Sequence, residues 1–183
     1  MIENEFKLLI SEADFTSIKS KVLHYYPEQH PIYIIQTNYY YDTIDFNLNK
    51  NGMTLRVISI GNENILQLKT VRKVVSQNKT SNEYHKSLKY IPNIINSNII
   101  PNNLQSSFQL IGCLKTDRTS FIISDNIRID LDKNSYLNKI DYEIEFEYDN
   151  EIPNELINYL TNELPIYKPI GKYERLLELL ITK

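Results

Sequence analysis

Apolar and polar positions alternate along several segments of the chain, and the first ten residues show the pattern most clearly. There, Glu3, Glu5 and Lys7 alternate with apolar residues such as Phe6 and Leu8. Successive side chains of a strand point to opposite faces, so this strand would have one charged and one apolar face. Glu and Lys are uncommon in strands. One such strand is typical of a half-exposed sheet, whereas several would indicate a charged binding site.

Later segments repeat the alternation or are rich in β-branched and aromatic residues, as strands are. Together with the first segment they predict eight strands. The seven further segments are residues 33–41, 53–60, 64–71, 81–87, 114–124, 126–133 and 138–148.

Helices are predicted between and after these strands. Ser11 can cap a helix to His24, with Asp14 at the capping-box position. Further helices are predicted from Pro153 to Leu164 and from Gly171 to Thr182. The remaining predictions are short helices near 93–98 and 101–111, a loop at 42–52, and a polar hairpin tip or loop at 72–79.

These elements favour an α+β fold in one domain, residues 1–183. The apolar faces of the strands need a cover, which the helices can supply. If the sheet closes into an eight-stranded antiparallel barrel with helices outside, the charged faces line its lumen and no long edge stays exposed. A lumen that holds acids and bases together suits a multivalent anion with its metal ion.

Composition narrows the class of protein. The net charge of −3 and pI near 5.7 argue against a general nucleic-acid binder. Cys113 is the one cysteine, so no disulfide forms within the chain, and its apolar neighbours predict a buried packing role. We expect neither a signal peptide nor a membrane span, and therefore a cytoplasmic protein.

An ordered set of motifs resembles the CYTH superfamily, also called the triphosphate tunnel metalloenzymes. The first is Glu-x-Glu-x-Lys at residues 3–7, which is a weak pattern when taken alone. The others follow in the family's order at residues 40–43, 52–56, 66–69, 143–145 and 172–175. The resemblance spans essentially the whole chain and is strongest to a Gram-positive bacterial branch.

The resemblance implies an eight-stranded tunnel that binds a triphosphate and Mg²⁺ or Mn²⁺, with a homodimer as a further expectation. Hard oxygen ligands suit these ions. The implied metal ligands are Glu3, Glu5, Glu143 and Glu145. The implied triphosphate-binding residues are Lys7, Arg56, Lys69, Arg118, Arg128, Lys172 and Arg175. Catalytic roles would go to Glu5, Glu145, Lys69 and Arg118, and Glu83, His85 and Asp130 are further candidates.

Three functions stay open at this point: a metal-dependent triphosphate hydrolase, a class IV adenylate cyclase that makes cyclic AMP, and a non-catalytic triphosphate sensor. Thr116 stands where family members often carry a lysine, which favours the sensor. Lys172 and Arg175 could also be ordinary solvated residues of a first helical turn, and Asp42 is better explained as a loop cap than as a ligand.

Overall fold

The computed structural model describes residues 2–101, 106–151, 153–165 and 170–182. The helices are α1 (Glu12–Tyr25), α2 (Asn47–Lys50), α3 (Asn154–Thr161) and α4 (Lys172–Ile181), with a 3₁₀ turn at Ser97–Ile99. The strands are β1 (Ile2–Ile10), β2 (Ile32–Asp42), β3 (Met53–Ile60), β4 (Glu63–Val75), β5 (Asn78–Leu88), β6 (Ile94–Asn96), β7 (Ser107–Ser124), β8 (Ile127–Tyr136) and β9 (Lys139–Tyr148).

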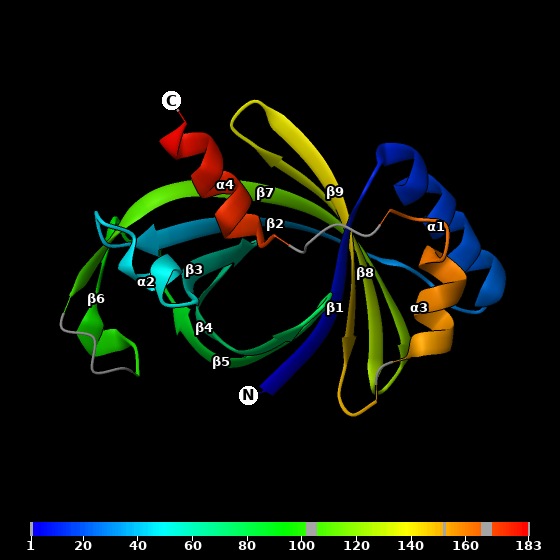
Figure 1. The fold of residues 1–183 in the computed structure, drawn as a ribbon. Coiled ribbons are helices and arrows are strands. Elements are labelled where there is room, and N and C mark those ends of the chain that lie inside the picture. The colour runs from blue at the N-terminus through cyan, green and yellow to red at the C-terminus, as the bar shows by residue number, and fades with distance from the viewer. Residues whose placement is uncertain (1, 102–105, 152, 166–169, 183) are drawn as a thin grey trace.

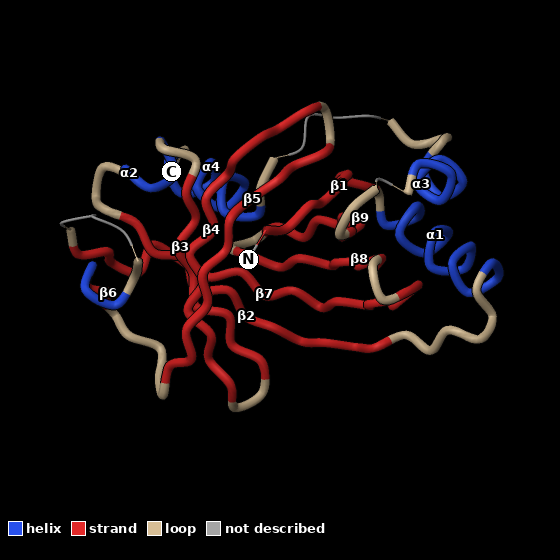
Figure 2. Tube along the Cα trace, turned by 90° about the horizontal axis from the view of Figure 1, so that it is seen from below, coloured by secondary structure: helices blue, strands red, loops and turns tan. Residues whose placement is uncertain are grey.

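Eight of the strands in the described part of the chain form a closed antiparallel barrel. Neighbouring strands follow the order β2-β3-β4-β5-β1-β9-β8-β7, and an extensive β2–β7 pairing closes the ring. The ninth strand, β6, pairs only with the start of β7. Figures 1 and 2 show the strands curving into one barrel, with α1 and α3 together at one end of the molecule. The predicted α+β barrel is confirmed.

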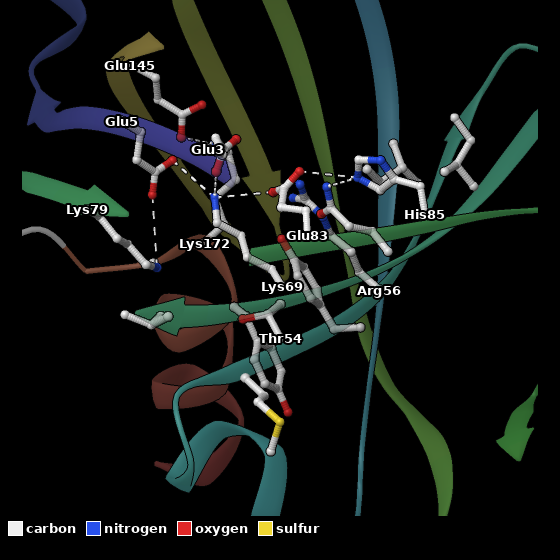
Figure 3. Close-up of a pocket in the computed structure, with 18 of the residues that line it drawn as sticks. Glu3, Glu5, Thr54, Arg56, Lys69, Lys79, Glu83, His85, Glu145 and Lys172 are labelled. Carbon is white, nitrogen blue, oxygen red and sulfur yellow. Dashed lines mark hydrogen bonds and ion pairs between the residues drawn. The ribbon is translucent and has the colours of Figure 1, made fainter. Parts of the chain in front are cut away.

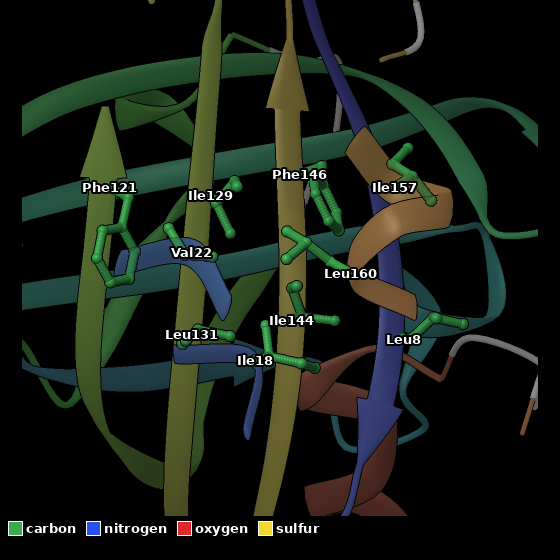
Figure 4. Packing of buried hydrophobic residues seen from close by; sticks show 10 residues of the cluster. All are labelled: Leu8, Ile18, Val22, Phe121, Ile129, Leu131, Ile144, Phe146, Ile157 and Leu160. Carbon is green, nitrogen blue, oxygen red and sulfur yellow. The ribbon is translucent and has the colours of Figure 1, made fainter. Parts of the chain in front are cut away.

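The first hydrophobic core lies outside the barrel wall, under α1 and α3. Outward residues of β1, β7, β8 and β9, such as Leu8 and Phe146, pack against Ile18 and Val22 of α1 and Leu160 of α3 (Figure 4). Helix α1 starts at the predicted capping box of Ser11 and Asp14. Because side chains alternate along each strand, placing these apolar residues outward turns the charged residues between them inward.

A second core covers the outer face of β2 to β5. Leu55, Val57 and Leu66 pack there against Leu48 of α2 and Ile95 of β6. The predicted helices near 93–98 and 101–111 are therefore wrong where the chain is described: the first is strand β6 plus a 3₁₀ turn, and residues 107–111 begin β7. Residues 102–105 lie outside the described residues. The segment lacks a helical apolar stripe and contributes single buried side chains to the sheet instead.

Two further sequence expectations can be compared with the structure. For the 72–79 segment the hairpin tip is confirmed and the loop is wrong, because β4 and β5 continue as a paired hairpin almost to its tip. Cys113 is exposed rather than buried. Its neighbour Leu114 is fully buried, so the alternation of the strand turns the thiol away from that core. No described helix is long and apolar enough to cross a membrane.

Helix α4 packs on a third core next to the barrel lumen. Tyr173 stacks on Tyr40 with a ring-centroid separation of 5.0 Å, and Leu176 approaches Gly112 closely. Tyr173 also donates a hydrogen bond to the Asp42 carboxylate, which accepts backbone N–H groups from its own loop as well. The prediction that Asp42 is a loop cap is confirmed, and these contacts fix the start of α4 beside the lumen.

Candidate active site

The barrel lumen contains a cavity of about 550 Å³ that is lined mainly by charged and polar side chains. Figure 3 shows them converging from separate strands and from the start of α4. Most of the predicted site residues line this cavity, namely Glu3, Glu5, Lys7, Arg56, Lys69, Glu83, His85, Arg118, Arg128, Glu145 and Lys172. Asp130, Glu143 and Arg175 are not among the lining residues, and Asp130 and Glu143 are fully buried.

Lys69 of β4 joins acidic side chains of β1 and β5. Its Nζ contacts Glu3 and lies 3.3 Å from Glu5 Oε2 and 3.6 Å from Glu83 Oε1. Lys79 approaches the other oxygen of Glu5 at 4.0 Å. The strand register explains the cluster, because Glu3 and Glu5 lie on β1, the neighbour of β5, which carries Glu83.

Arg118 of β7 joins three further carboxylates. Its nitrogens lie 2.5 Å from Asp130 Oδ2, 2.7 Å from Asp132 Oδ2 and 2.8 Å from Glu145 Oε2. Lys7 binds the other oxygen of Glu145 at 2.6 Å. Removing one partner of such a buried pair is costly, since it leaves an uncompensated charge.

Lys172 and Arg175 extend this network from α4 and are not solvated first-turn residues. Both are buried, with 6% and 3% of their surface exposed. Lys172 contacts Glu143, and Arg175 Nη2 lies 2.8 Å from the other oxygen of the same carboxylate. Arg175 also binds Asp141 at 2.9 Å. Arg175 thus holds Glu143 behind the cavity wall.

Arg56 differs from the other strong bases of the lumen. Its Nε donates to Gln67 Oε1 at 2.6 Å, and it forms no ion pair with any carboxylate in the described part of the chain. Gln67 Nε2 lies 2.8 Å from the ring of His85, which is 3.2 Å from Glu83. Arg56 can therefore bind an anion without first breaking an ion pair.

The dense pairing keeps the central acids ionised. Although burial opposes ionisation, Lys7 and Lys69 hold the pKa of Glu5 well below its usual range. Lys7 and Arg118 likewise outweigh burial and lower the pKa of Glu145 to about 2. At neutral pH both carboxylates are charged and able to bind a cation.

Two groups of acids among the described residues have oxygens close enough to share a metal ion. One is Asp130, Glu145 and Glu147, and the other is Asp132, Glu143 and Glu145; within each, the oxygens lie within 4.8 Å of one another. In the first group Asp130 Oδ1 is buried without a hydrogen-bond partner among the described residues. This oxygen-only donor set with an unused oxygen fits Mg²⁺ or Mn²⁺. Glu3 and Glu5 belong to neither group.

Two members of these groups were not predicted as ligands, and one base of the cavity was not predicted. Asp132 and Glu147 continue the alternation of Asp130 and Glu145, so the signal was present. Lys79 was missed because its segment was predicted as a hairpin tip or loop, and therefore as lying away from the lumen. Thr116, which stands where family members often carry a lysine, is fully buried. Its hydroxyl donates a hydrogen bond to Asn134 Oδ1 at 2.8 Å, and it supplies no positive charge to the cavity.

Glu147 provides a prediction that depends on pH. Burial raises its pKa from 4.5 to about 7, against the opposing effect of Arg128, which lies 2.5 Å away. Below pH 4.5 the carboxyl is protonated in both the folded and the unfolded protein, so it has no effect. Between pH 4.5 and 7 the unfolded protein has lost this proton while the folded protein still holds it, so the free energy of unfolding falls with rising pH. Above pH 7 the loss is complete, at roughly 3 kcal/mol.

Glu147→Gln should therefore be more stable than wild type at pH 8, with a free energy of unfolding that is higher by on the order of 1–3 kcal/mol and a correspondingly higher unfolding temperature. At pH 4.5 the two proteins should match. Thermal unfolding in EDTA measures this, with the exposed Glu151→Gln as control. A variant that is less stable than wild type at pH 8 would contradict the argument.

Comparison with known proteins agrees with this architecture. A family model described as the CYTH domain matches residues 1–174. The chain belongs to the CYTH domain family. This confirms the resemblance inferred from the motifs. None of the curated proteins matches the sequence.

Solved structures with the CYTH fold include cyclase-named and triphosphatase-named proteins. An adenylyl cyclase-named protein from Hippeastrum, HpAC1, described as having a dominant triphosphatase activity, superposes with a TM-score of 0.74 at 19% identity, covering 96% of this chain and 95% of that one. An adenylate cyclase-named protein from Bacillus halodurans gives 0.68 at 22% identity, covering 93% and 95%. The Mimivirus capping enzyme triphosphatase gives 0.53 at 15%, covering 88% and 87%. At these identities the likeness concerns the fold.

Proposed function

We propose that this CYTH protein is a metal-dependent hydrolase of a triphosphate-containing substrate, either inorganic tripolyphosphate or a small organic triphosphate. The observation that carries the proposal is one cavity in the barrel lumen with bases from six strands and a helix beside a group of acids. These bases are Lys7, Arg56, Lys69, Lys79, Arg118, Arg128 and Lys172. A compact chain of phosphates has the charge and the size to bind to several of them at once.

Arg56 would be the first residue to bind phosphate, because its guanidinium has no carboxylate partner among the described residues. Arginine can offer two parallel N–H donors to a phosphate. Lys69 and Arg118 would bind phosphate oxygens by exchanging some of their carboxylate contacts for them. The carboxylates released in this way become available to a cation, so anion and metal binding support each other.

The metal ion would be held by Glu145 and Glu147, which line the cavity, and by Asp130 behind them. Glu3 and Glu5, predicted from the motif, stay proposed ligands that would first have to release Lys69. When bound, Mg²⁺ or Mn²⁺ neutralises phosphate charge and lowers the pKa of a bound water. In the reaction, water adds to the terminal phosphorus and the bridging P–O bond breaks.

Product analysis tests this function. Purified protein is incubated with Mg²⁺ or Mn²⁺ and with tripolyphosphate, ATP or thiamine triphosphate, with EDTA as control, and the products are separated. We expect metal-dependent release of orthophosphate from at least one substrate. Cyclic AMP from ATP would instead identify a cyclase, and tight binding without turnover would identify a sensor.

A further inference from the structure

Four residues form a continuous row across neighbouring strands on the lumen side of the barrel. Tyr40 of β2 is the cross-strand partner of Arg56 on β3, Arg56 is that of Gln67 on β4, and Gln67 is that of His85 on β5. Cross-strand partners lie on the same face, with their side chains in contact range. All four line the cavity, and Figure 3 shows Arg56 and His85 on the opposite side of the drawn residues from Glu145. The row therefore lies apart from the acid groups of β8 and β9.

Gln67 is the central residue of this row. It is buried, with 5% of its surface exposed. Its Oε1 accepts a hydrogen bond from Arg56 Nε at 2.6 Å, and its Nε2 lies 2.8 Å from His85 Nε2. A guanidinium can only donate, so the amide oxygen must face Arg56 and the amide NH₂ must face His85. Both ends of the buried amide therefore have a partner, as burial requires.

This orientation of the amide assigns the role of His85. Because Gln67 Nε2 is a donor, His85 Nε2 accepts the hydrogen bond and the ring N–H is on Nδ1. Glu83 Oε2 lies 3.2 Å from the same nitrogen and is its more distant neighbour. If the amide were turned over, its NH₂ would face Arg56 and its oxygen would face the accepting nitrogen of His85, so neither hydrogen bond would form. His85 thus helps to fix the amide.

Gln67 holds Arg56 without cancelling its charge. Arg118 and Arg128, the other arginines of the described chain that line the cavity, are both bound by a carboxylate, at 2.5 Å and 3.0 Å from Asp130 Oδ2. An amide accepts a hydrogen bond but carries no charge. The positive charge of Arg56 therefore stays available for an anion.

The contact at Nε also determines which edge of the Arg56 guanidinium can bind a ligand. A guanidinium has five N–H donors in one plane. Gln67 takes the donor on Nε, which leaves the two terminal nitrogens, each with one N–H directed away from the side chain. These two parallel donors match two oxygens of a phosphate. A side chain that is held in place before binding also loses less entropy when the ligand binds.

We propose that Gln67 and His85 are positioning residues that hold the terminal nitrogens of Arg56 ready for a phosphate group of the substrate. His85 acts through Gln67, and Gln67 acts through Arg56. The inference deepens the proposed function and rests on it for the anion that Arg56 would bind. Neither positioning residue has to contact the phosphate chain itself.

A double-mutant cycle tests this order of action. An imido analogue of tripolyphosphate is titrated calorimetrically, with Mg²⁺ present, into wild type, Gln67→Met, Arg56→Ala and the double variant. We expect Gln67→Met to weaken binding by about three- to tenfold in the wild-type background, the scale of one hydrogen bond. In the Arg56→Ala background it should change the affinity by less than about twofold, because the residue on which it acts is absent. Equal losses in both backgrounds, or no loss in wild type, would overturn the inference.

Two substitutions of His85 separate positioning from a role in folding. Glutamine can place an acceptor oxygen where the imidazole has Nε2, whereas leucine has no acceptor. We expect His85→Leu to weaken binding of the analogue by about three- to fivefold and His85→Gln to stay within about twofold of wild type. Loss of affinity in both variants, or in neither, would overturn the role of His85.

A measurement without metal or phosphate separates this inference from the proposed function. The Nε–H of Arg56 is identified in hydrogen–nitrogen correlation spectra as the signal that Arg56→Ala removes. Gln67→Met should shift this signal and speed its exchange with water. The control Gln36→Met changes a similarly buried glutamine of the cavity whose partner on β3 is Ile60, and it should leave the signal in place.

A signal that Gln67→Met leaves unchanged would overturn the inference, whatever the protein binds or hydrolyses. If the signal responds to Gln67→Met while wild type binds no analogue, the positioning of Arg56 holds and the proposed function fails.

Discussion

Glu145→Gln should lower metal-dependent triphosphate hydrolysis by about three orders of magnitude. Glu145 is the only residue shared by the two acid groups of the described chain, and it also contacts Lys7, Arg118 and Lys172. Losing a metal ligand removes several kcal/mol of charge stabilisation in the transition state, and about 4 kcal/mol corresponds to a thousandfold rate. Phosphate release at saturating Mg²⁺ and Mn²⁺ measures the effect.

The control for this variant is Glu63→Gln, an exposed position at the start of β4 that should keep wild-type activity. From the sequence alone, loss of an acid in a wet lumen should leave the fold unaffected. The structure changes that expectation, because removing Glu145 leaves one buried and two partly buried cations without one of their partners and should lower stability. Activity is therefore compared at a temperature where both variants are folded. Retention of more than half the wild-type rate would exclude Glu145 from the metal site.

Arg56→Ala should weaken tripolyphosphate binding ten- to hundredfold, which corresponds to roughly 1.5–3 kcal/mol for a lost charge-assisted hydrogen bond. The guanidinium is partly buried in the cavity wall and forms no ion pair with a described carboxylate, so little compensates for its loss. Calorimetric titration of tripolyphosphate at moderate salt measures the affinity.

Arg72→Ala is the matched control, because it removes the same charge from an exposed position on β4. Exposed charges change such affinities by well under about 1 kcal/mol. Equal affinities for Arg56→Ala and Arg72→Ala would mean that Arg56 does not bind the phosphate chain, and would remove the strongest anion anchor from the proposed site.

The barrel was predictable because its information is local to each strand. Alternation such as that of Glu3, Glu5 and Lys7 indicates which face of a strand is apolar. Helices with an apolar stripe indicate which elements cover that face. The segment 93–111 was not predictable in the same way. Its few apolar residues, such as Ile95 and Phe108, pack on β3 and β4, and this packing determines their conformation. The local pattern of apolar and polar residues does not reveal it.

The candidate site was likewise predictable only in part. The alternation of residues showed which side chains face the lumen. It did not show their ion-pair partners, because these depend on the strand register and on the position of α4. Nothing in the order of residues indicates that Lys172 reaches Asp132, or that Arg175 holds Glu143 behind the wall. The short motif gave the acids of β1, whereas the acid groups that fit a metal lie on β8 and β9.

We expect a triphosphate and a divalent ion to bind together inside the barrel. This can be tested with crystals grown with Mn²⁺ and an imido analogue of tripolyphosphate, with data recorded at a wavelength where Mn²⁺ scatters anomalously. An anomalous peak is expected against Glu145 and Glu147, with phosphate oxygens against Arg56, Lys69 and Arg118. Mn²⁺ or the analogue bound only on the outside of the barrel, with the lumen charges paired as described here, would contradict it.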